Sequence, residues 1–155
     1  MNAYSELLRY LKLLADRDDA IKTVTNGADI DLDKGNIFPL MNIDINDATF
    51  TGTSTVSFEV EIACLDIRHV DTKEDGRDKF YLNDNEIDNY NGMMAALQRL
   101  WTQSKRDYDN NLITASDAPR LQQITKEGVN LLDGWIMTFS VELPMTEINL
   151  CSGIC

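Results

Sequence analysis

The chain has 155 residues, 43% hydrophobic and 26% charged, which is typical of one globular domain and excludes disordered and fibrous proteins. Its 14 basic and 26 acidic residues give a net charge of −12, which disfavours gripping DNA or an anionic membrane, although an acidic wall would let DNA slide past. Because no apolar stretch reaches about 18 residues and no signal pattern opens the chain, we expect a cytosolic origin and no membrane association.

Two elements are predicted in the first 27 residues. Apolar residues recur at helical spacing from Asn2 to about Arg17, with Glu6 off the stripe, which predicts a helix with one buried face. That stripe consists of Tyr4, Leu7, Leu8, Leu11 and Leu14. The β-branched content of residues 21–25 then predicts a short strand that ends before Gly27.

Two strands joined by a hairpin are predicted next. In residues 40–45, Met41, Ile43 and Ile45 alternate with polar Asn42 and Asp44, as a half-buried strand requires. Residues 49–55 supply the hairpin connection, and the strand 56–62 alternates apolar and polar residues throughout. After Cys64 the apolar phase shifts to Leu65 and Ile67, which predicts a bulge or bend there.

A solvated loop and a second helix are predicted for the middle of the chain. Residues 66–85 are rich in charge and predict the loop, and Asn83 or Asn85 is the expected cap of a helix over residues 86–104. Residues 105–111 are polar and are expected to lie beyond the helix. The buried stripe of this helix is predicted from Ile87, Tyr90, Met94, Leu97 and Trp101.

The last elements are strands, and together they indicate the fold class. Weaker strand patterns cover residues 120–126 and 129–132, and a strong one covers Trp135 to Leu143, ended by Pro144. The order of elements predicts an α+β fold, with an antiparallel or mixed sheet and two long helices on one face. We expect one domain over residues 1–144 and a C-terminal extension, a candidate docking arm, over residues 145–155.

Two oxygen-rich clusters resemble cation sites. Asp29, Asp31 and Asp33 resemble the start of a calcium loop, but the following glycine is one place late and Leu40 occupies the position of the required glutamate. A strand with a solvated acidic face explains the same residues. The second cluster runs from Asp84 to Asp88, and a capped helix terminus accounts for it.

Other chemical sites are not indicated by the sequence. A zinc site would need Cys64, His69, Cys151 and Cys155, which include no C-x-x-C pair and no second histidine, so free thiols are expected. His69, the one histidine, lies in a charged segment and is expected at the surface rather than as a catalytic base. No phosphate cradle, nucleophile elbow or zinc-protease motif is present, so we expect neither catalysis nor a cofactor.

The order of elements resembles a known group of viral proteins. It comprises an amphipathic helix, a strand at 38–43, a hairpin, a strand at 58–62, a long loop, a helix at 90–101 and a closing strand at 134–143. This arrangement is similar to bacteriophage tail-terminator and head-to-tail connector (neck ring) proteins, and the closing strand suggests those of crAss-like or other podovirus-type phages. The resemblance runs from Tyr4 to Leu143 and excludes the C-terminal extension.

The resemblance implies a structural virion protein without catalytic residues. Such subunits form a sixfold or twelvefold homo-oligomeric ring at the phage neck, join portal or head-completion proteins to the tail, and surround a DNA channel. The protein would be assembled in the host cytoplasm and reside in the virion. The charged loop and the apolar tail are the expected contacts between subunits, through Asp71, Glu74, Asp75, Arg77, Asp78, Ile148, Leu150 and Ile154.

Two other classes of protein stay open at this point. A non-enzymatic adaptor or binding module of similar α+β layout would be favoured by a monomer with a ligand pocket. An enzyme would be favoured if turnover depended on His69 or on the cluster from Asp84 to Asp88.

Overall fold

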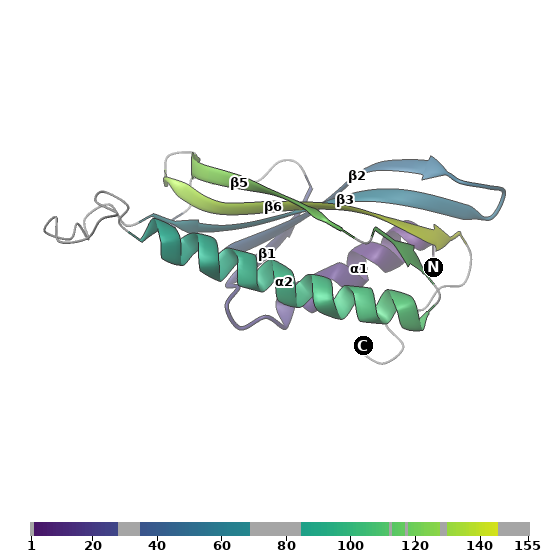
Figure 1. Ribbon diagram of the computed structural model, residues 1–155, viewed down its shortest axis with the longest axis horizontal. Coiled ribbons are helices and arrows are strands. Elements are labelled where there is room, and N and C mark those ends of the chain that lie inside the picture. Colours follow the sequence, from purple (N-terminus) through teal and green to yellow (C-terminus); the bar gives the residue numbers. More distant parts are fainter. Residues whose placement is uncertain are drawn as a thin grey trace, which may run out of the picture.

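The computed structural model describes residues 2–27, 35–68, 85–111, 113–116, 118–127 and 130–145. It has the predicted α+β class: a mixed six-stranded sheet with α1 and α2 side by side on one of its faces (Figure 1). In chain order the elements are α1 (Ala3–Asp16), β1 (Thr23–Asn26), β2 (Leu40–Phe50), β3 (Thr55–Ile67), α2 (Glu86–Asn110), β4 (Thr114–Ala115), β5 (Arg120–Glu127) and β6 (Leu132–Pro144).

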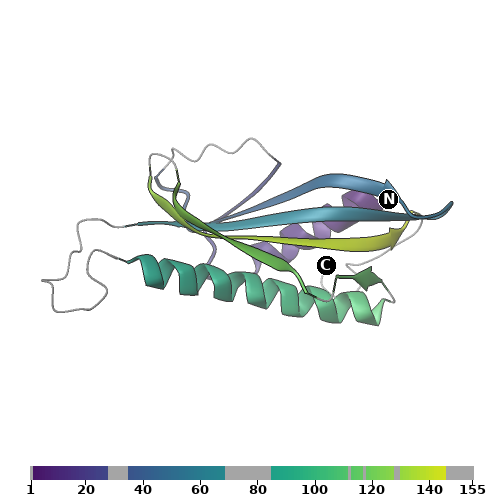
Figure 2. The same cartoon turned by 45° about the horizontal axis from the view of Figure 1, so that its top comes forward.

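The sheet is built around the long antiparallel pair of β3 and β6. These two strands stay in one uninterrupted register from the pair Thr55–Pro144 to the pair Ile67–Leu132. On the far side of β3 lies β2, antiparallel to it, followed by β1, which is parallel to β2. On the far side of β6 lie β4 and β5, both antiparallel to β6 (Figure 2). Strands β1 and β2 therefore lie on one side of the sheet, and β4 and β5 on the other.

The strand predictions are confirmed where alternation was strict. Met137, Phe139, Val141 and Leu143 of β6 are buried on the helix side of the sheet, with Trp135 half-buried, as the pattern required. Strands β1, β2, β3 and β5 overlap their predicted ranges, although β2 extends to Phe50 and so shortens the hairpin connection to residues 51–54. The strand predicted at 129–132 is wrong for residues 130 and 131, which form a turn before β6, and the short strand β4 was not predicted.

The predicted bulge after Cys64 is wrong. Strand β3 is regular there, and the register shift occurs instead in β2, between Ile45 and Asp47. Leu65 breaks the apolar phase because this end of the sheet is covered on both faces. The second cover is a small apolar cluster on the helix-free face, formed by Phe38, Leu40, Leu65 and Leu132.

Asn42 also departs from its prediction, since it was assigned to the solvated face of β2 and is only 6% exposed. Its side chain accepts a hydrogen bond from Thr25 Oγ1 (2.9 Å) and donates one to the carbonyl of Gly27 (3.0 Å). A buried amide is tolerated when its polar atoms are paired in this way. Asn42 therefore ties β1 to the edge of β2.

The buried face of α1 is rotated from the predicted stripe. Tyr4 is 45% exposed, whereas Glu6, expected off the stripe, is buried. The buried side of the helix consists of Ala3, Glu6, Leu7, Tyr10, Leu11 and Ala15. The prediction was wrong because it used only the large apolar side chains. In α1 alanines also lie on the buried side, and Tyr10 is fully buried.

Helix α2 is longer than predicted, and its stripe is also rotated. It continues through residues 105–110, which were expected to lie beyond it, because Ser104 and Tyr108 extend the buried face by another turn. Ile87 is 43% exposed, and only Leu97 of the predicted stripe is fully buried. The buried side consists of Asn89, Met93, Ala96, Leu97, Leu100, Ser104 and Tyr108.

One glycine is required where β3 and β6 meet. A Cβ added at Gly134 would lie 1.9 Å from the carbonyl oxygen of Cys64, so Gly134→Ala should push the two strands apart. We expect a loss of about 1–3 kcal/mol in the free energy of unfolding, measured by urea denaturation. Gly92→Ala in α2 is the control, since a Cβ there meets nothing within 4 Å and the change should stabilise by about 0.5–1 kcal/mol. Equal effects would contradict the close approach.

Candidate assembly surfaces

The residues predicted to join neighbouring subunits lie outside the described residues. Five belong to the segment 69–84 and three to the segment 146–155: Asp71, Glu74, Asp75, Arg77, Asp78, Ile148, Leu150 and Ile154. The same holds for Asp29, Asp31 and Asp33 of the calcium-like pattern, and for Asp84. The surfaces described below are therefore built from other residues.

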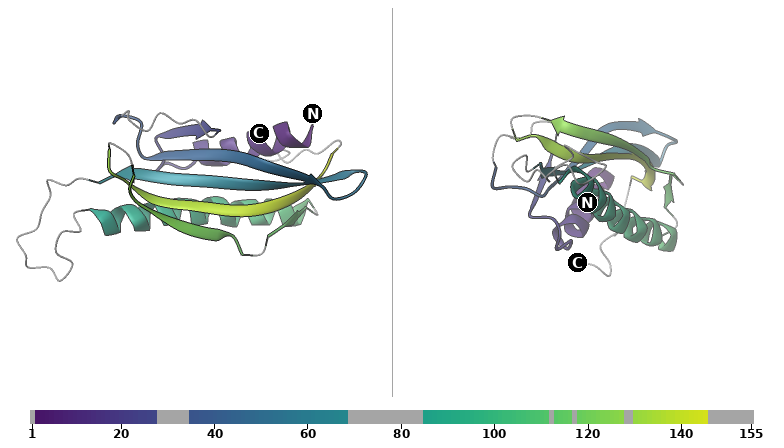
Figure 3. Two further views of the ribbon diagram at one scale, coloured as in Figure 1. Left: turned by 90° about the horizontal axis from the view of Figure 1, so that it is seen from above. Right: turned by 60° about the vertical axis from the view of Figure 1, so that its left-hand side comes forward.

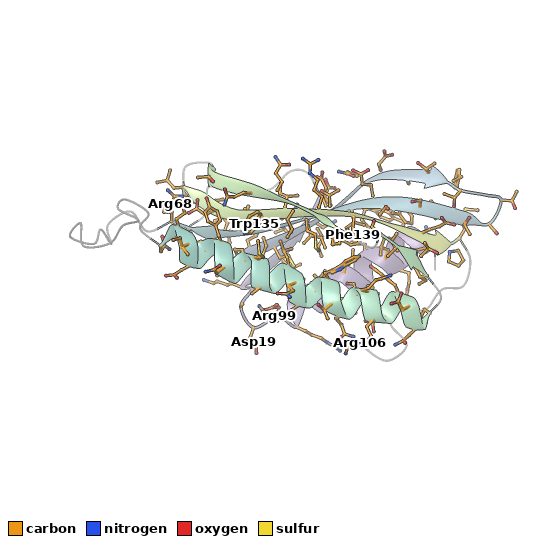
Figure 4. All side chains as sticks on the ribbon, in the orientation of Figure 1. Asp19, Arg68, Arg99, Arg106, Trp135 and Phe139 are labelled. Carbon is orange, nitrogen blue, oxygen red and sulfur yellow. The ribbon has the colours of Figure 1, made fainter. Side chains whose placement is uncertain are left out.

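A buried ion pair anchors the chain where it leaves β3. Arg68 was predicted in the solvated loop but is only 5% exposed. Its guanidinium donates two hydrogen bonds to the fully buried carboxylate of Asp133, at 2.7 Å and 2.9 Å, and its Nη2 lies 3.0 Å from Glu86 Oε1. Hydrogen bonding to Asp133 raises the pKa of Arg68, so the guanidinium stays charged. It joins the end of β3, the start of β6 and the first turn of α2 (Figure 4).

Two asparagines fix the start of α2 at the same place. Asn85 occupies the predicted cap position, but its side chain makes no capping bond and donates instead to the carbonyl of Ile67 (3.1 Å). Asn89 Nδ2 donates to the same carbonyl (3.0 Å). The two ends of the 69–84 connection are therefore held together, at Arg68 and at Asn85.

Strand β5 is attached to α2 through an aromatic pair. Trp135 Nε1 donates to the carbonyl of Tyr90 (3.0 Å), and the two rings meet edge to face at 5.9 Å. The Tyr90 hydroxyl lies 2.5 Å from Thr125 Oγ1 of β5 and 3.0 Å from Glu86 Oε1. Desolvation raises the pKa of Tyr90, which keeps the hydroxyl protonated as a donor. These contacts hold the outermost strand in line with the sheet.

The helix-free face of the sheet carries a group of acidic side chains, here called the open face. Asp44 of β2 lies directly opposite Glu61 of β3, and Asp47 lies opposite Glu59. Glu142 of β6 lies on the same side, opposite Ser57. Like charges placed opposite each other across strands destabilise a sheet. This face, seen from above in Figure 3, is therefore more acidic than folding requires.

Both helices carry exposed cations. Arg9 and Lys12 of α1 and Arg99 and Arg106 of α2 are exposed. Figure 4 shows Arg99 and Arg106 on the side of α2 that points away from the sheet. These cations do not make the helix layer basic, because the same two helices carry six acidic residues: Glu6, Asp16, Glu86, Asp88, Asp107 and Asp109.

A groove lies between the end of α1 and the middle of α2. Its volume is about 780 Å³, and Leu14, Met41 and Leu100 line its apolar part. Arg99 and Asp18 also line it and form a two-bond ion pair, each bond 2.9 Å long. The groove is an alternative place for a ligand.

The helices meet beyond that groove at a pair of tyrosines. The Tyr10 hydroxyl donates to Asp107 Oδ2 (2.5 Å), and the rings of Tyr10 and Tyr108 are 5.8 Å apart. Burial, reinforced by Asp107, raises the pKa of Tyr10, and burial likewise raises that of Tyr108. Neither hydroxyl is therefore set up as a base at neutral pH.

The described residues offer little for catalysis or metal binding. Cys64 is fully buried, its Sγ lies 3.4 Å from Met93 Sδ, and burial raises its pKa, so it is a poor nucleophile. Within the described ranges no group of three or more His, Cys, Asp or Glu side chains is placed to hold a metal ion. His69, Cys151 and Cys155, the other members of the zinc set, lie outside those ranges.

No protein-family model matches the chain, and no match was found among curated proteins. In the described part of the chain, neither helix has the length and apolar character needed to span a membrane.

The Arg68–Asp133 pair is expected to be the most sensitive polar contact described here. Asp133→Ala leaves a buried guanidinium without its main partner and should lower the free energy of unfolding by about 3–5 kcal/mol. Asp109→Ala, which removes the exposed partner of Lys105, is the control and should cost less than about 1 kcal/mol. Urea denaturation of the two variants measures the difference, and similar losses would refute the assignment.

Proposed function

We propose that this protein is a structural subunit of a ring at the neck of a tailed bacteriophage, between portal or head-completion proteins and the tail. In this proposal copies of the chain surround the channel through which DNA passes, and the protein has no catalytic role. It resides in the virion after assembly in the host cytoplasm.

The open face is the observation that supports this proposal best. Two acid–acid pairs, Asp44–Glu61 and Asp47–Glu59, stand in register on one face, with Glu142 beside them. A domain that needed only to be soluble would gain stability by placing a cation in each pair. A face turned toward DNA gains from the acids, because they repel the phosphate backbone and prevent it from sticking.

The layout of the fold is compatible with this role. Both helices lie on one face of the sheet, so the open face can line a channel while the helix layer points outward (Figure 1).

A second candidate function is favoured by the groove between α1 and α2. Its volume of about 780 Å³ is within the usual range of small-ligand pockets, and its rim carries both Arg99 and Asp18. A monomeric adaptor that binds a peptide or small molecule there would explain the groove. It would leave the acid pairs of the open face without a role.

Native mass spectrometry with negative-stain imaging tests the proposal, first on the purified protein and then on whole virions of the source phage. Closed rings, or antibody labelling at the virion neck, are the expected results. A monomer that is also absent from virions would overturn the proposal and leave the adaptor as the better candidate.

The channel-facing role of the open face has its own test. Replacing Glu59, Glu61 and Glu142 with lysine should make the protein retain double-stranded DNA at low salt, whereas the unaltered chain should not. The control replaces three exposed acids near the helices, Asp16, Asp19 and Asp88, so the net charge is the same. Filter binding measures retention, and equal retention by both variants would show that net charge alone decides it.

A further inference from the structure

The groove between α1 and α2 has an apolar floor. Met41 and Ala15 are buried there, Leu100 is 5% exposed, and Leu14 is half-buried beside them. With a volume of about 780 Å³, the groove has room for the side chains of a short peptide segment. An occupant of this floor must therefore bring apolar side chains.

The rim of the groove carries a guanidinium that is held in place. Arg99 donates to both oxygens of Asp18, and Asp18 Oδ1 also accepts from the N–H of Ala20 (3.0 Å), in the turn that follows α1. Those bonds use Nε and Nη2 of Arg99, so Nη1 can still serve a partner, and the side chain is 53% exposed (Figure 4). Hydrogen bonding to Asp18 raises the pKa of Arg99, so the group stays charged. A fixed guanidinium of this kind binds a carboxylate well.

The floor and the rim together select an apolar segment that also carries a carboxylate. The C-terminal extension 145–155, predicted as a docking arm, contains such a segment: Glu147 precedes Ile148, and Leu150 follows two residues later. The two aliphatic side chains match the floor of the groove. The carboxylate beside them matches Arg99 at the rim.

The extension leaves the fold far from the groove of its own chain. Met41 at the floor lies opposite Cys64, which lies opposite Trp135 of β6. From Trp135, β6 runs toward Met145, which is roughly 30 Å farther along the sheet at about 3.3 Å per residue. There the N–H of Met145 donates to the carbonyl of Ser54 (2.8 Å), which fixes the start of the extension beside the hairpin.

This distance excludes the segment of the same chain as the occupant. An extended chain gains at most about 3.6 Å per residue, so Ile148 lies within about 11 Å of Met145 and Leu150 within about 18 Å. Neither side chain can cover the roughly 30 Å back to Met41. The segment can fill the groove only in another copy.

We propose that residues 147–150 of one copy bind in the groove of a second copy, with Ile148 and Leu150 on the apolar floor and Glu147 on Arg99. The contact joins two different surfaces, so it repeats head to tail and can close into a ring. Successive copies then follow one another along the strand direction, which leaves the open faces to line the channel. The inference rests on the proposed ring function and names the contact between its subunits.

Two variants that each remove one side of the contact test the proposal together. In the full chain, Leu14→Glu places a carboxylate in the groove, whereas Ile148→Asp combined with Leu150→Asp removes the apolar part of the segment. Each should weaken self-association on the order of tenfold or more, measured by analytical ultracentrifugation. An equal mixture of the two should form dimers and nothing larger, because it offers one intact segment and one intact groove per pair of chains.

Two further variants separate the contact from damage to the fold. Ile87→Glu on α2 is the control, since Ile87 is 43% exposed and lies outside the groove, and it should leave association unchanged. Ala20→Glu adds a carboxylate at an exposed position of the groove and replaces Leu14→Glu if urea denaturation shows that the latter unfolds. Association that weakens equally in the control would overturn the proposal.

The ion pair has its own test. Glu147→Lys should weaken association about threefold to tenfold at low salt, and the difference should shrink at high salt, because an exposed charge pair is screened. Glu142→Lys makes the same change of charge on the open face and should have no effect. Equal effects would show that net charge alone acts and would overturn the role of Arg99.

The remaining outcomes distinguish this contact from the ring itself. Variants that associate normally, or a mixture that stays monomeric, would overturn the contact. Weakening by the groove variant but not by the segment variant would assign the groove to another occupant and overturn it as well. Rings that persist in both variants would leave the neck function in place, and an unaltered chain that stays monomeric would overturn the contact while virion labelling still decides that function.

Discussion

The ladder between β3 and β6 is the contact on which the other elements depend. It runs without a break from Thr55 to Ile67 of β3 and from Leu132 to Pro144 of β6. Its close approach is possible because Gly134 has no Cβ to meet the carbonyl of Cys64. The helix-side residues of this pair form the surface on which α2 packs, whereas α1 lies mainly over β1 and β2. One end of the pair is joined to α2 through Arg68, which bonds both Asp133 and Glu86. The other strands add to its two sides.

Strands were predicted well and helix faces poorly, for a physical reason. A strand whose two faces meet different environments shows them directly as alternation, as in residues 56–62 and 135–143. A helix that packs closely can place small or polar residues at the contact, as Ala96 and Ser104 do in α2, so its large apolar residues mark only the border of the buried face. The register shift in β2 was missed because nothing in the types of residues 45–47 distinguishes a bulge from a regular strand.

The candidate surfaces were predicted least, because they depend on which strands become neighbours. The acids of β2 and β3 are visible in the sequence, but only the register brings Asp44 opposite Glu61. Arg68 and Asp133 are 65 positions apart, and each follows or begins an apolar run without any sign that the two meet. The charge in residues 66–85 predicts a solvated loop, but Arg68, which lies in that range, is only 5% exposed. Pairing between distant strands, rather than local pattern, decides these sites.

The open face follows from a constraint on any sheet with helices on one side. A sheet with helices on only one face must either expose its other face or cover it with a partner. Here the apolar cluster around Leu65 covers one end of that face. The remainder carries acids, which are more stable in solvent than against a packed partner and which repel a polyanion. If copies surround a channel as proposed, turning this face inward would give the channel a continuous acidic wall, and the helices would lie on the outside.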